Sequence, residues 1–394
     1  MTRSMIIGTG MTSLCKKSGL VASKLVQAGL ERALASAGVR LRQLDGIVAV
    51  PSLSEPRFME AHYLATRMGL LPHKGLVART IDTGGAGPIS GLLEADWMVR
   101  TQGLDLVAVV AGDAVSSLGT EEFLRRADAG CADSEGSLPS PVIPNGYNRI
   151  AQWAIDSGSV TRKQLAMASV LMSIQAVKHP LALTKVAHTL ADVLHSKPVA
   201  SVTTLLECAR RADGGAAVIV ASSNFVKKHG LKPGPVIVGG GEASGPLYPP
   251  RVIDDELFSC EEAANRAYAA ASCGPLDINF FGLYDCFPIC FIRALEAVGK
   301  AERGQGGAYV ESIYNLAQRN GGTLDPNHFP INTHGGLLSF GAPWETPAIY
   351  SAIEAVAQLT GTAGDRQVDK CNRALVYGNG GIFSASAVAI LERP

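Results

Sequence analysis

The sequence lacks several features that would place it in a simple functional class. Its 394 residues carry no net charge, because 35 Lys and Arg balance 35 Asp and Glu. This balance argues against a nucleic-acid partner and against binding to a membrane surface through basic residues. No stretch reaches the roughly 18 consecutive apolar residues of a membrane span. An apolar strand pattern begins already at Met5, which leaves little room for a secretory signal. We therefore expect an intracellular protein without a membrane span.

Paired cysteines and metal-ligand patterns are missing as well. The eight cysteines are scattered, with no CxxC pair, and no His/Cys cluster has zinc spacing. We expect free thiols in a reducing compartment and no metal site. Glycine, in contrast, is abundant, with 43 residues that cluster in particular loops.

The order of apolar segments predicts an α/β protein whose second half repeats the first. In the first half, strand patterns alternate with helix patterns, and the first helix is expected to end at Gly38. The same alternation returns in the second half, and it favours mostly parallel, buried sheets. The division we predict is an N-terminal half at 1–117, a loop domain at 118–225 and a C-terminal half at 226–394. The last part of the loop domain, about 212–225, is expected to rejoin the N-terminal sheet.

Four blocks of sequence, taken in order, carry a family resemblance. They read VLHSKPVASVTTLLECARRADGGAAVIVAS, LYDCFPICFIRALEAVG, INTHGGLLSFGAP and LVYGNGGIFSASAVAIL. Together they resemble the thiolase family, within it the sterol carrier protein thiolase branch, and also the thiolase-like group of trypanosomatids. The resemblance implies a thiolase fold, a duplicated αβαβα five-layered core of two stacked five-stranded sheets with an inserted loop domain. It also implies coenzyme A, or an acyl-CoA thioester, as substrate or ligand, with no permanently bound cofactor.

The sequence departs from the family pattern at three chemical positions. The place of the nucleophilic cysteine falls on Gly85, the histidine of the Gly-His-Pro block on Ala342, and the histidine of the His-Asp-Cys-Phe block on Tyr284. Only Cys286 of these chemical groups is kept. Because the nucleophile is missing, we expect no acyl-enzyme.

The tetrapeptide Tyr284-Asp285-Cys286-Phe287 supplies the main candidate catalytic residues. The resemblance implies that Cys286 moves the proton at the substrate's α-carbon, although a free cysteine is often only a small buried apolar residue. Tyr284 is either a donor to an enolate or alkoxide oxygen or a strand-end aromatic with a hydrogen-bonded hydroxyl. We expect Asp285 to cap a helix or hold a loop, and Cys290 to lie in the core.

Two glycine-rich turns and one further block complete the predicted site. Asn332 or His334 is expected to donate a hydrogen bond in the thioester pocket, the alternative being a tight turn that needs glycine. The resemblance implies that the backbone N–H groups near Gly85 and Gly380 form an oxyanion hole, which does not depend on the lost cysteine side chain.

Basic residues of the loop domain are candidates for binding the phosphates of coenzyme A. We single out Arg125, Arg126, Lys178 and His179, although most charges in this region are expected to be solvated.

The resulting hypothesis is a thiolase-like protein of lipid metabolism that binds acyl-CoA and cannot form the usual acyl-enzyme. If it is an enzyme, enolate chemistry such as malonyl-CoA decarboxylation or cleavage of a β-oxygenated acyl-CoA is favoured. The alternatives are a catalytically inactive acyl-CoA-binding or scaffolding protein and a thiolase-fold aldolase half that needs a partner. A monomer or a homodimer is expected, in the mitochondrion or the cytoplasm.

Overall fold

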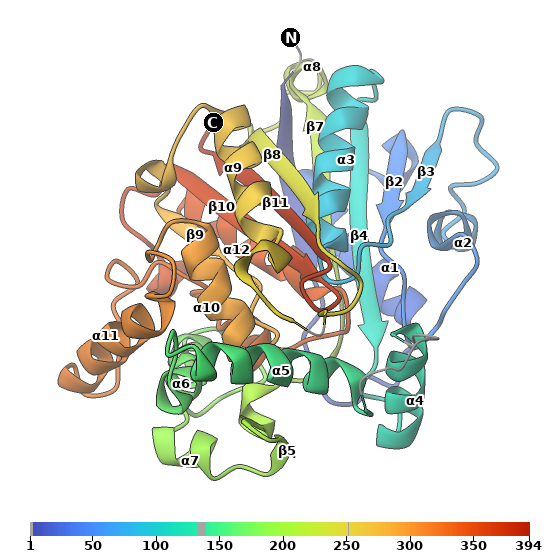
Figure 1. Cartoon of the computed structure of the whole chain (residues 1–394). Coiled ribbons are helices and arrows are strands. Elements are labelled where there is room, and N and C mark those ends of the chain that lie inside the picture. The colour runs from blue at the N-terminus through green and yellow to red at the C-terminus, as the bar shows by residue number, and fades with distance from the viewer. Residues whose placement is uncertain (1–2, 132–138, 251) are drawn as a thin grey trace.

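The computed structural model describes residues 3–131, 139–250 and 252–394 and shows an α/β protein (Figure 1). The strands are β1 (Ser4–Met11), β2 (Gly46–Ala49), β3 (Val77–Thr80), β4 (Leu106–Ala114), β5 (Pro198–Ala200), β6 (Thr203–Thr204), β7 (Asp213–Ser222), β8 (Val236–Ser244), β9 (Phe280–Gly282), β10 (Arg373–Gly380) and β11 (Ala385–Glu392). The α-helices are α1 (Ala22–Ala37), α2 (Glu60–Arg67), α3 (Gly87–Thr101), α4 (Thr120–Gly130), α5 (Val142–Asp156), α6 (Arg162–Val177), α7 (Leu190–Leu194), α8 (Ser223–Lys228), α9 (Cys260–Ala271), α10 (Pro288–Ala297), α11 (Gly306–Arg319) and α12 (Pro347–Thr360).

The large sheet preserves the two halves predicted from the sequence. Its strand order is β3-β2-β4-β7-β1-β8-β11-β10-β9, so one side holds the strands of the first half and the other side those of the second. The halves meet at β1 and β8, where Met5 pairs with Val236. In the second half, an isolated parallel bridge from Phe281 to Ile331 extends the sheet beyond β9. The α/β class and the duplicated arrangement are therefore confirmed.

The expectation of mostly parallel sheets was wrong. Among the described pairs, only β2–β3, β2–β4 and β9–β10 run parallel, and the other pairs of the large sheet are antiparallel. The apolar patterning misled because strands buried on both faces show continuous apolar runs whatever their direction.

Helices form layers on and between the two halves of the sheet. Both α3 and α12 contact strands of both halves, whereas α1 covers β1, β4 and β7, and α9 covers β8 and β11. As predicted, α1 ends at Gly38, whose φ of 68° is in the left-handed region that glycine adopts without strain. Both β4 and β7 are buried along their whole length, and the loops of the site follow the ends of such buried strands.

The loop region between β4 and β7 forms a separate group of helices. Figure 1 shows α4, α5, α6 and α7 gathered at the end of the sheet where β4 ends. The strand at the end of this region is β7, which lies between β4 and β1 in the sheet. The three-part division itself stays a prediction. In the described chain, no helix has the length and apolar character to cross a membrane.

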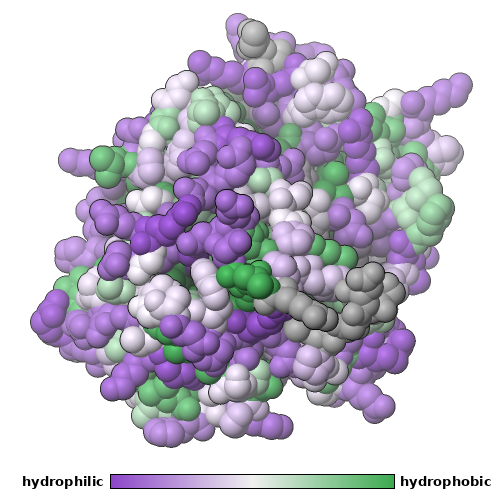
Figure 2. Space-filling model, in the orientation of Figure 1, coloured by the Kyte–Doolittle hydropathy of each residue, from purple (hydrophilic) through white to green (hydrophobic). Residues whose placement is uncertain are grey.

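Large apolar side chains on the surface are few and dispersed. Figure 2 shows mostly hydrophilic residues on the visible face, with small apolar groups between them. Phe58, Val186 and Leu276 are exposed large apolar residues that come from three separate segments.

Candidate functional site

Two glycine-rich segments meet backbone to backbone at the centre of the candidate site. A Cβ atom on Gly380 would lie 1.9 Å from the carbonyl oxygen of Thr83, and one on Gly84 would lie 2.9 Å from the Cα atom of Gly380. Such distances exclude any side chain at either position. The structure thus brings together the Gly85 loop and the Gly380 strand end, as predicted, while their role as an oxyanion hole stays a prediction.

Tyr284 fills the space beside Gly85. A Cβ atom on Gly85 would lie 2.0 Å from the Tyr284 hydroxyl oxygen and 2.5 Å from the carbonyl oxygen of Asn379. Tyr284 follows β9 and is 6% exposed. Burial, followed by the neighbouring thiols of Cys286 and Cys290, raises the pKa of Tyr284 well above its ordinary value. The phenol is therefore a neutral donor, placed where the side chain of residue 85 would otherwise stand.

Cys286 lies in a buried group of thiols and phenols. Cys286 and Phe287 are the two residues before the start of α10 at Pro288. The Cys286 carbonyl oxygen accepts a hydrogen bond from the Ala209 N–H at 2.9 Å. The Cys286 thiol is a neighbour of Cys290 and of the Tyr147 hydroxyl, and it adds to burial in raising the pKa of both. Cys290 is fully buried, and its thiol donates to the Tyr284 carbonyl oxygen at 3.5 Å. The prediction of a core position for Cys290 is confirmed.

Tyr147, on α5, connects the loop region to the turn that contains Gly380. Its hydroxyl donates to the Gly381 carbonyl oxygen at 2.7 Å and accepts from the side-chain amide of Asn379 at 2.6 Å. Its ring stacks on Phe287, with ring centroids 4.7 Å apart. Tyr147 therefore ties the Gly380 turn to the segment that carries Cys286.

Asp285 holds the turn that follows Asn332 rather than facing a substrate. Its carboxylate accepts from the Leu337 N–H at 2.7 Å and from the Leu338 N–H at 3.4 Å. These groups belong to a short π-helix, Gly336–Phe340. Burial raises the pKa of Asp285 to about 7. The loop-holding role expected for Asp285 agrees with these contacts.

Asn332 is engaged by the strand end next to it. Its side-chain oxygen accepts from the Leu283 N–H at 2.7 Å and its amide donates to the Leu283 carbonyl oxygen at 2.7 Å. It also contacts the sulfur of Met172 at 3.7 Å. These contacts join the Asn332 turn to the Tyr284 segment and leave no free donor on the amide. A direct role in catalysis stays a prediction.

His334 lies in the same turn but has no polar partner on Nδ1 among the described residues. It is 2% exposed and packs edge-on against Phe340 with ring centroids 5.2 Å apart. Burial, followed by the positive charge of Arg366, lowers its pKa to about 3. His334 is therefore neutral, and its predicted role as a donor to the thioester stays untested.

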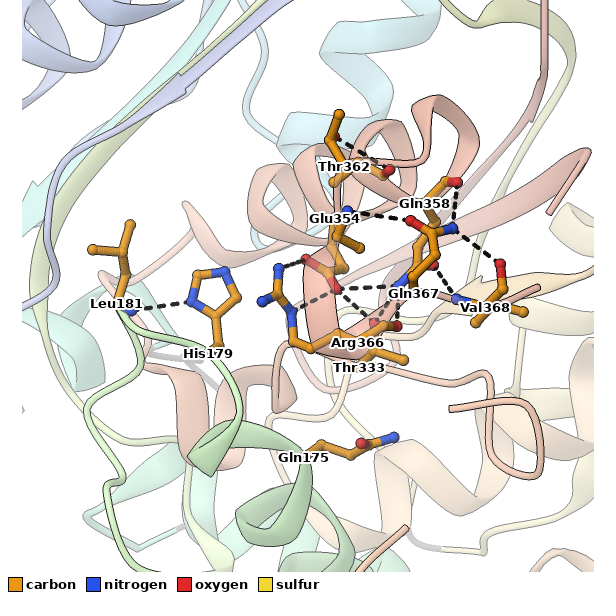
Figure 3. Close-up of polar contacts among 12 residues, drawn as sticks. Gln175, His179, Leu181, Thr333, Glu354, Gln358, Thr362, Arg366, Gln367 and Val368 are labelled. Atoms are coloured by element: carbon orange, nitrogen blue, oxygen red, sulfur yellow. Dashed lines mark hydrogen bonds and ion pairs between the residues drawn. The ribbon is translucent and has the colours of Figure 1, made fainter. Parts of the chain in front are cut away.

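A buried polar network supports this turn from behind (Figure 3). Glu354 accepts from the Thr333 hydroxyl at 2.6 Å, and it pairs with Arg366 through bonds of 3.0 and 3.1 Å. Gln358 donates to Thr333 at 3.0 Å and to the Arg366 carbonyl oxygen at 2.7 Å. The network fixes Thr333 and therefore the backbone on either side of it, Asn332 and His334.

The four basic residues predicted to bind coenzyme A occupy two separate places. Lys178 donates to the Leu324 carbonyl oxygen, and His179 is buried with a pKa lowered to about 3 by burial. Arg125 and Arg126 both pair with Glu122 on α4, and Arg126 also binds the carbonyl oxygens of 53 and 54. Of the four, Arg125 has the most exposed charge, and phosphate binding by any of them stays a prediction.

The described residues form no metal site, and a cavity found among them lies away from Cys286. Within the described ranges, no group of three or more His, Cys, Asp or Glu side chains could hold a metal ion. A cavity of about 300 Å³ lies beside α9 and α10, lined by residues that include Phe258, Cys260 and Arg293, rather than at Cys286.

Sequence reasoning missed two residues of this site. Nothing in the sequence marked Tyr147 as a site residue, because it stands inside an ordinary amphipathic helix pattern. The sequence did mark Glu345, because a carboxylate three residues after Ala342 interrupts an apolar, glycine-rich block. Its Oε2 atom is buried without a hydrogen-bond partner among the described residues.

Comparisons with known proteins agree with this fold. The model of the thiolase C-terminal domain-like family matches residues 253–393. An acetyl-CoA acetyltransferase of Methanothermobacter thermautotrophicus is 30% identical over 377 residues, which are 94% of this chain and 94% of that protein. Sterol carrier protein 2 of Bos taurus is 30% identical over 264 residues, 65% of this chain and 47% of that protein, so the match spans about half of that longer relative.

A solved structure extends the similarity to the whole chain. The structure named Ltp2-ChsH2(DUF35) aldolase has a TM-score of 0.80 at 22% identity and covers 99% of this chain and 98% of its own. Human mitochondrial 3-ketoacyl-CoA thiolase has a TM-score of 0.72 at 15% identity and covers 100% of this chain and 98% of its own, so the folded architecture is that of a thiolase. The near full-length match to the acetyltransferase shows that the chain belongs to the thiolase family, with sterol carrier protein thiolases among its relatives.

Proposed function

We propose that this protein binds coenzyme A thioesters and makes or breaks a carbon–carbon bond beside the thioester carbonyl, through an enolate and without an acyl-enzyme. One observation carries the proposal: the Tyr284 hydroxyl stands where a nucleophilic side chain at position 85 would be. A donor in that place can stabilise charge on a substrate oxygen, but it leaves no room for a covalent intermediate on residue 85.

The neighbouring groups supply the remaining functions of this chemistry. Cys286 moves the proton at the α-carbon of the thioester. Backbone N–H groups near Gly85 and Gly380 hold the enolate oxygen. The two backbone segments lie so close to each other that no side chain fits between them, which leaves the backbone open to a substrate. Tyr284 is neutral because of its raised pKa, so it donates a hydrogen bond without bringing a negative charge towards the enolate.

Support for carbon–carbon cleavage in particular comes from the structural neighbour named an aldolase. That likeness shows the fold, and the aldolase activity belongs to the neighbour. The name of that neighbour includes a second protein. A variant of the proposal is therefore that this chain is one half of an aldolase and acts with a partner. A stable one-to-one complex would support this variant.

The test is proton NMR in D₂O with acetyl-CoA, malonyl-CoA, acetoacetyl-CoA and a β-hydroxyacyl-CoA. We expect deuterium to enter the α-carbon, and we expect Cys286→Ala to remove this exchange. Cys290→Ala is the matched control, since Cys290 is also a buried thiol and stands four residues further along the chain. Line broadening of coenzyme A without exchange or turnover would instead support the inactive acyl-CoA-binding protein.

A further inference from the structure

Glu345 is a buried carboxyl group that no described cation neutralises. Its Oε1 atom accepts a hydrogen bond from the indole N–H of Trp344 at 3.1 Å. Its Oε2 atom is buried and has no partner among the residues that the structure describes. Burial, followed by the negative charges of Asp82 and Asp113, raises the pKa of Glu345 to about 8.

The position of Glu345 places it beside the candidate site. Asp82 directly precedes the Thr83–Gly87 turn, and Asp113 stands at the end of β4. The charge of Glu345 also contributes to the raised pKa of Tyr284 and of Cys131, at the end of α4. Glu345 is therefore close enough to the glycine loop, the end of β4, the end of α4 and the Tyr284 segment for its charge to act on titratable groups there.

The turn that carries Glu345 is strained and anchored. Trp344 has a φ of 47°, in the left-handed region that is costly for a residue with a side chain. Its ring packs edge-on against Phe123 of α4, with ring centroids 5.8 Å apart. On its other side, the Ala342 N–H donates to the Arg210 carbonyl oxygen at 2.7 Å. The direction of Glu345 is therefore fixed by its neighbours rather than by solvent.

An unpartnered carboxyl oxygen in the interior costs stability, because the group gives up its hydrogen bonds with water and gains none in return. Buried ionisable groups of this kind concentrate at functional sites. The buried carboxylate of Asp213, in contrast, accepts hydrogen bonds from Ser18, Ser116 and Ser117.

We propose that Glu345 is a further catalytic residue, the group that exchanges a proton with the β-oxygen of a β-hydroxyacyl thioester. This proposal rests on the function proposed above and deepens it. In the cleavage direction, the Glu345 carboxylate takes the hydroxyl proton, and the β-carbon becomes a carbonyl carbon. The Cα–Cβ electron pair moves to the α-carbon and into the thioester carbonyl as an enolate. The Cys286 thiol then gives its proton to the α-carbon, and both groups return to their resting states by exchange with solvent.

The pH dependence of this step has a defined sign. A general base works in its ionised form, so kcat/KM for cleavage rises with pH and levels off above the pKa of Glu345, about 8. The titratable groups that face Glu345 are Asp82, Asp113, Cys131 and Tyr284. Asp113 and Asp82 keep the pKa high, because ionisation of Glu345 adds a third negative charge beside them.

Glu345→Gln tests the proposal, with Glu60→Gln as a matched control. Glu60 is also a buried carboxyl with an unpartnered Oε2 atom, and burial raises its pKa to about 7, yet it is not among the groups that raise the pKa of Tyr284. The probes are short-chain, long-chain and alicyclic β-hydroxyacyl-CoA thioesters, with release of the carbonyl product measured. Exchange of the α-protons of acetyl-CoA in D₂O is measured in parallel.

We expect Glu345→Gln to lower kcat for cleavage by about 10²- to 10⁴-fold and to remove the rise of kcat/KM with pH. We expect α-proton exchange to remain at the wild-type rate, and Glu60→Gln to cleave like wild type. Cleavage at the wild-type rate by Glu345→Gln, or equal loss of cleavage and exchange, overturns the proposal. Wild-type protein that exchanges protons but cleaves none of the probes also overturns it while the enolate chemistry stands. Wild-type protein that does neither overturns the proposed function itself.

Discussion

The Tyr284 hydroxyl occupies the space that a side chain on residue 85 would need. A Cβ atom on Gly85 would lie 2.0 Å from the hydroxyl oxygen and 2.4 Å from the ring carbon that bears it. A tyrosine in this position and a side chain at 85 therefore exclude each other. The absence of a side chain at 85 and the position of the Tyr284 hydroxyl are therefore physically linked.

Gly85→Ala should destabilise the protein by about 1–3 kcal/mol, because the new methyl group forces Tyr284 or the Asn379 carbonyl out of place. Urea unfolding gives the free energy. Gly119→Ala is the control, since a Cβ atom there meets nothing within 4 Å. The cost should shrink in a Tyr284→Ala background, and an unchanged cost in that background would contradict the shared space.

Tyr147→Phe should lower the free energy of unfolding by about 1–3 kcal/mol, because it leaves the Gly381 carbonyl oxygen and the Asn379 amide without their partner. Tyr350→Phe provides the comparison. The Tyr350 hydroxyl is buried without a partner among the described residues, so its removal should be neutral or stabilising. Equal losses in the two variants would show that the Tyr147 hydrogen bonds do not hold the Gly380 turn.

The sequence was sufficient for the α/β class and the duplication, because these depend on apolar periodicity, and the family resemblance implied the meeting of the two glycine-rich segments. It was insufficient for strand direction, since buried parallel and antiparallel strands have the same apolar pattern. The contacts of Asn332 depend on which backbone groups it meets across the fold, and spacing does not reveal this. Glu345 was missed because its burial and the nearby charges of Asp82 and Asp113, which are distant in sequence, come from the fold. The intracellular location and the oligomeric state stay predictions.

Arg366→Met should destabilise the protein by about 3–5 kcal/mol, because the side chain of Glu354 is only 3% exposed and would keep an unpaired charge. A double-mutant cycle with Glu354→Gln measures the coupling, and the double variant should lose less than the sum of the single variants. Arg125→Met is the surface control, as the side chains of the Arg125–Glu122 pair are 66% and 38% exposed, and it should leave the free energy of unfolding almost unchanged. Additive losses at Arg366 and Glu354 would mean that the pair does not support the turn at Thr333.

Glu345→Gln should become more stable relative to wild type as the pH rises from 4.5 to about 8. The ordinary pKa of 4.5 is raised to about 8 in the folded protein, so over this range the unfolded chain ionises while the folded protein stays neutral. Wild type therefore loses stability that the glutamine variant keeps. Urea unfolding at several pH values measures the difference. Glu122→Gln should show no such trend between pH 5 and 8, since the hydrogen bonds from Arg125 and Arg126 lower the pKa of Glu122 to about 2. A flat difference for Glu345→Gln would contradict a buried, neutral carboxyl group.

The central claim is thioester enolate chemistry without a covalent intermediate. Its most direct test follows acetyl-CoA in D₂O by proton NMR and the intact protein by mass spectrometry in the same sample. We predict that the methyl protons exchange for deuterium while the mass of the protein stays that of the same protein kept in D₂O without acetyl-CoA. A protein mass increased by an acetyl group, or methyl protons that remain unexchanged, would contradict the account.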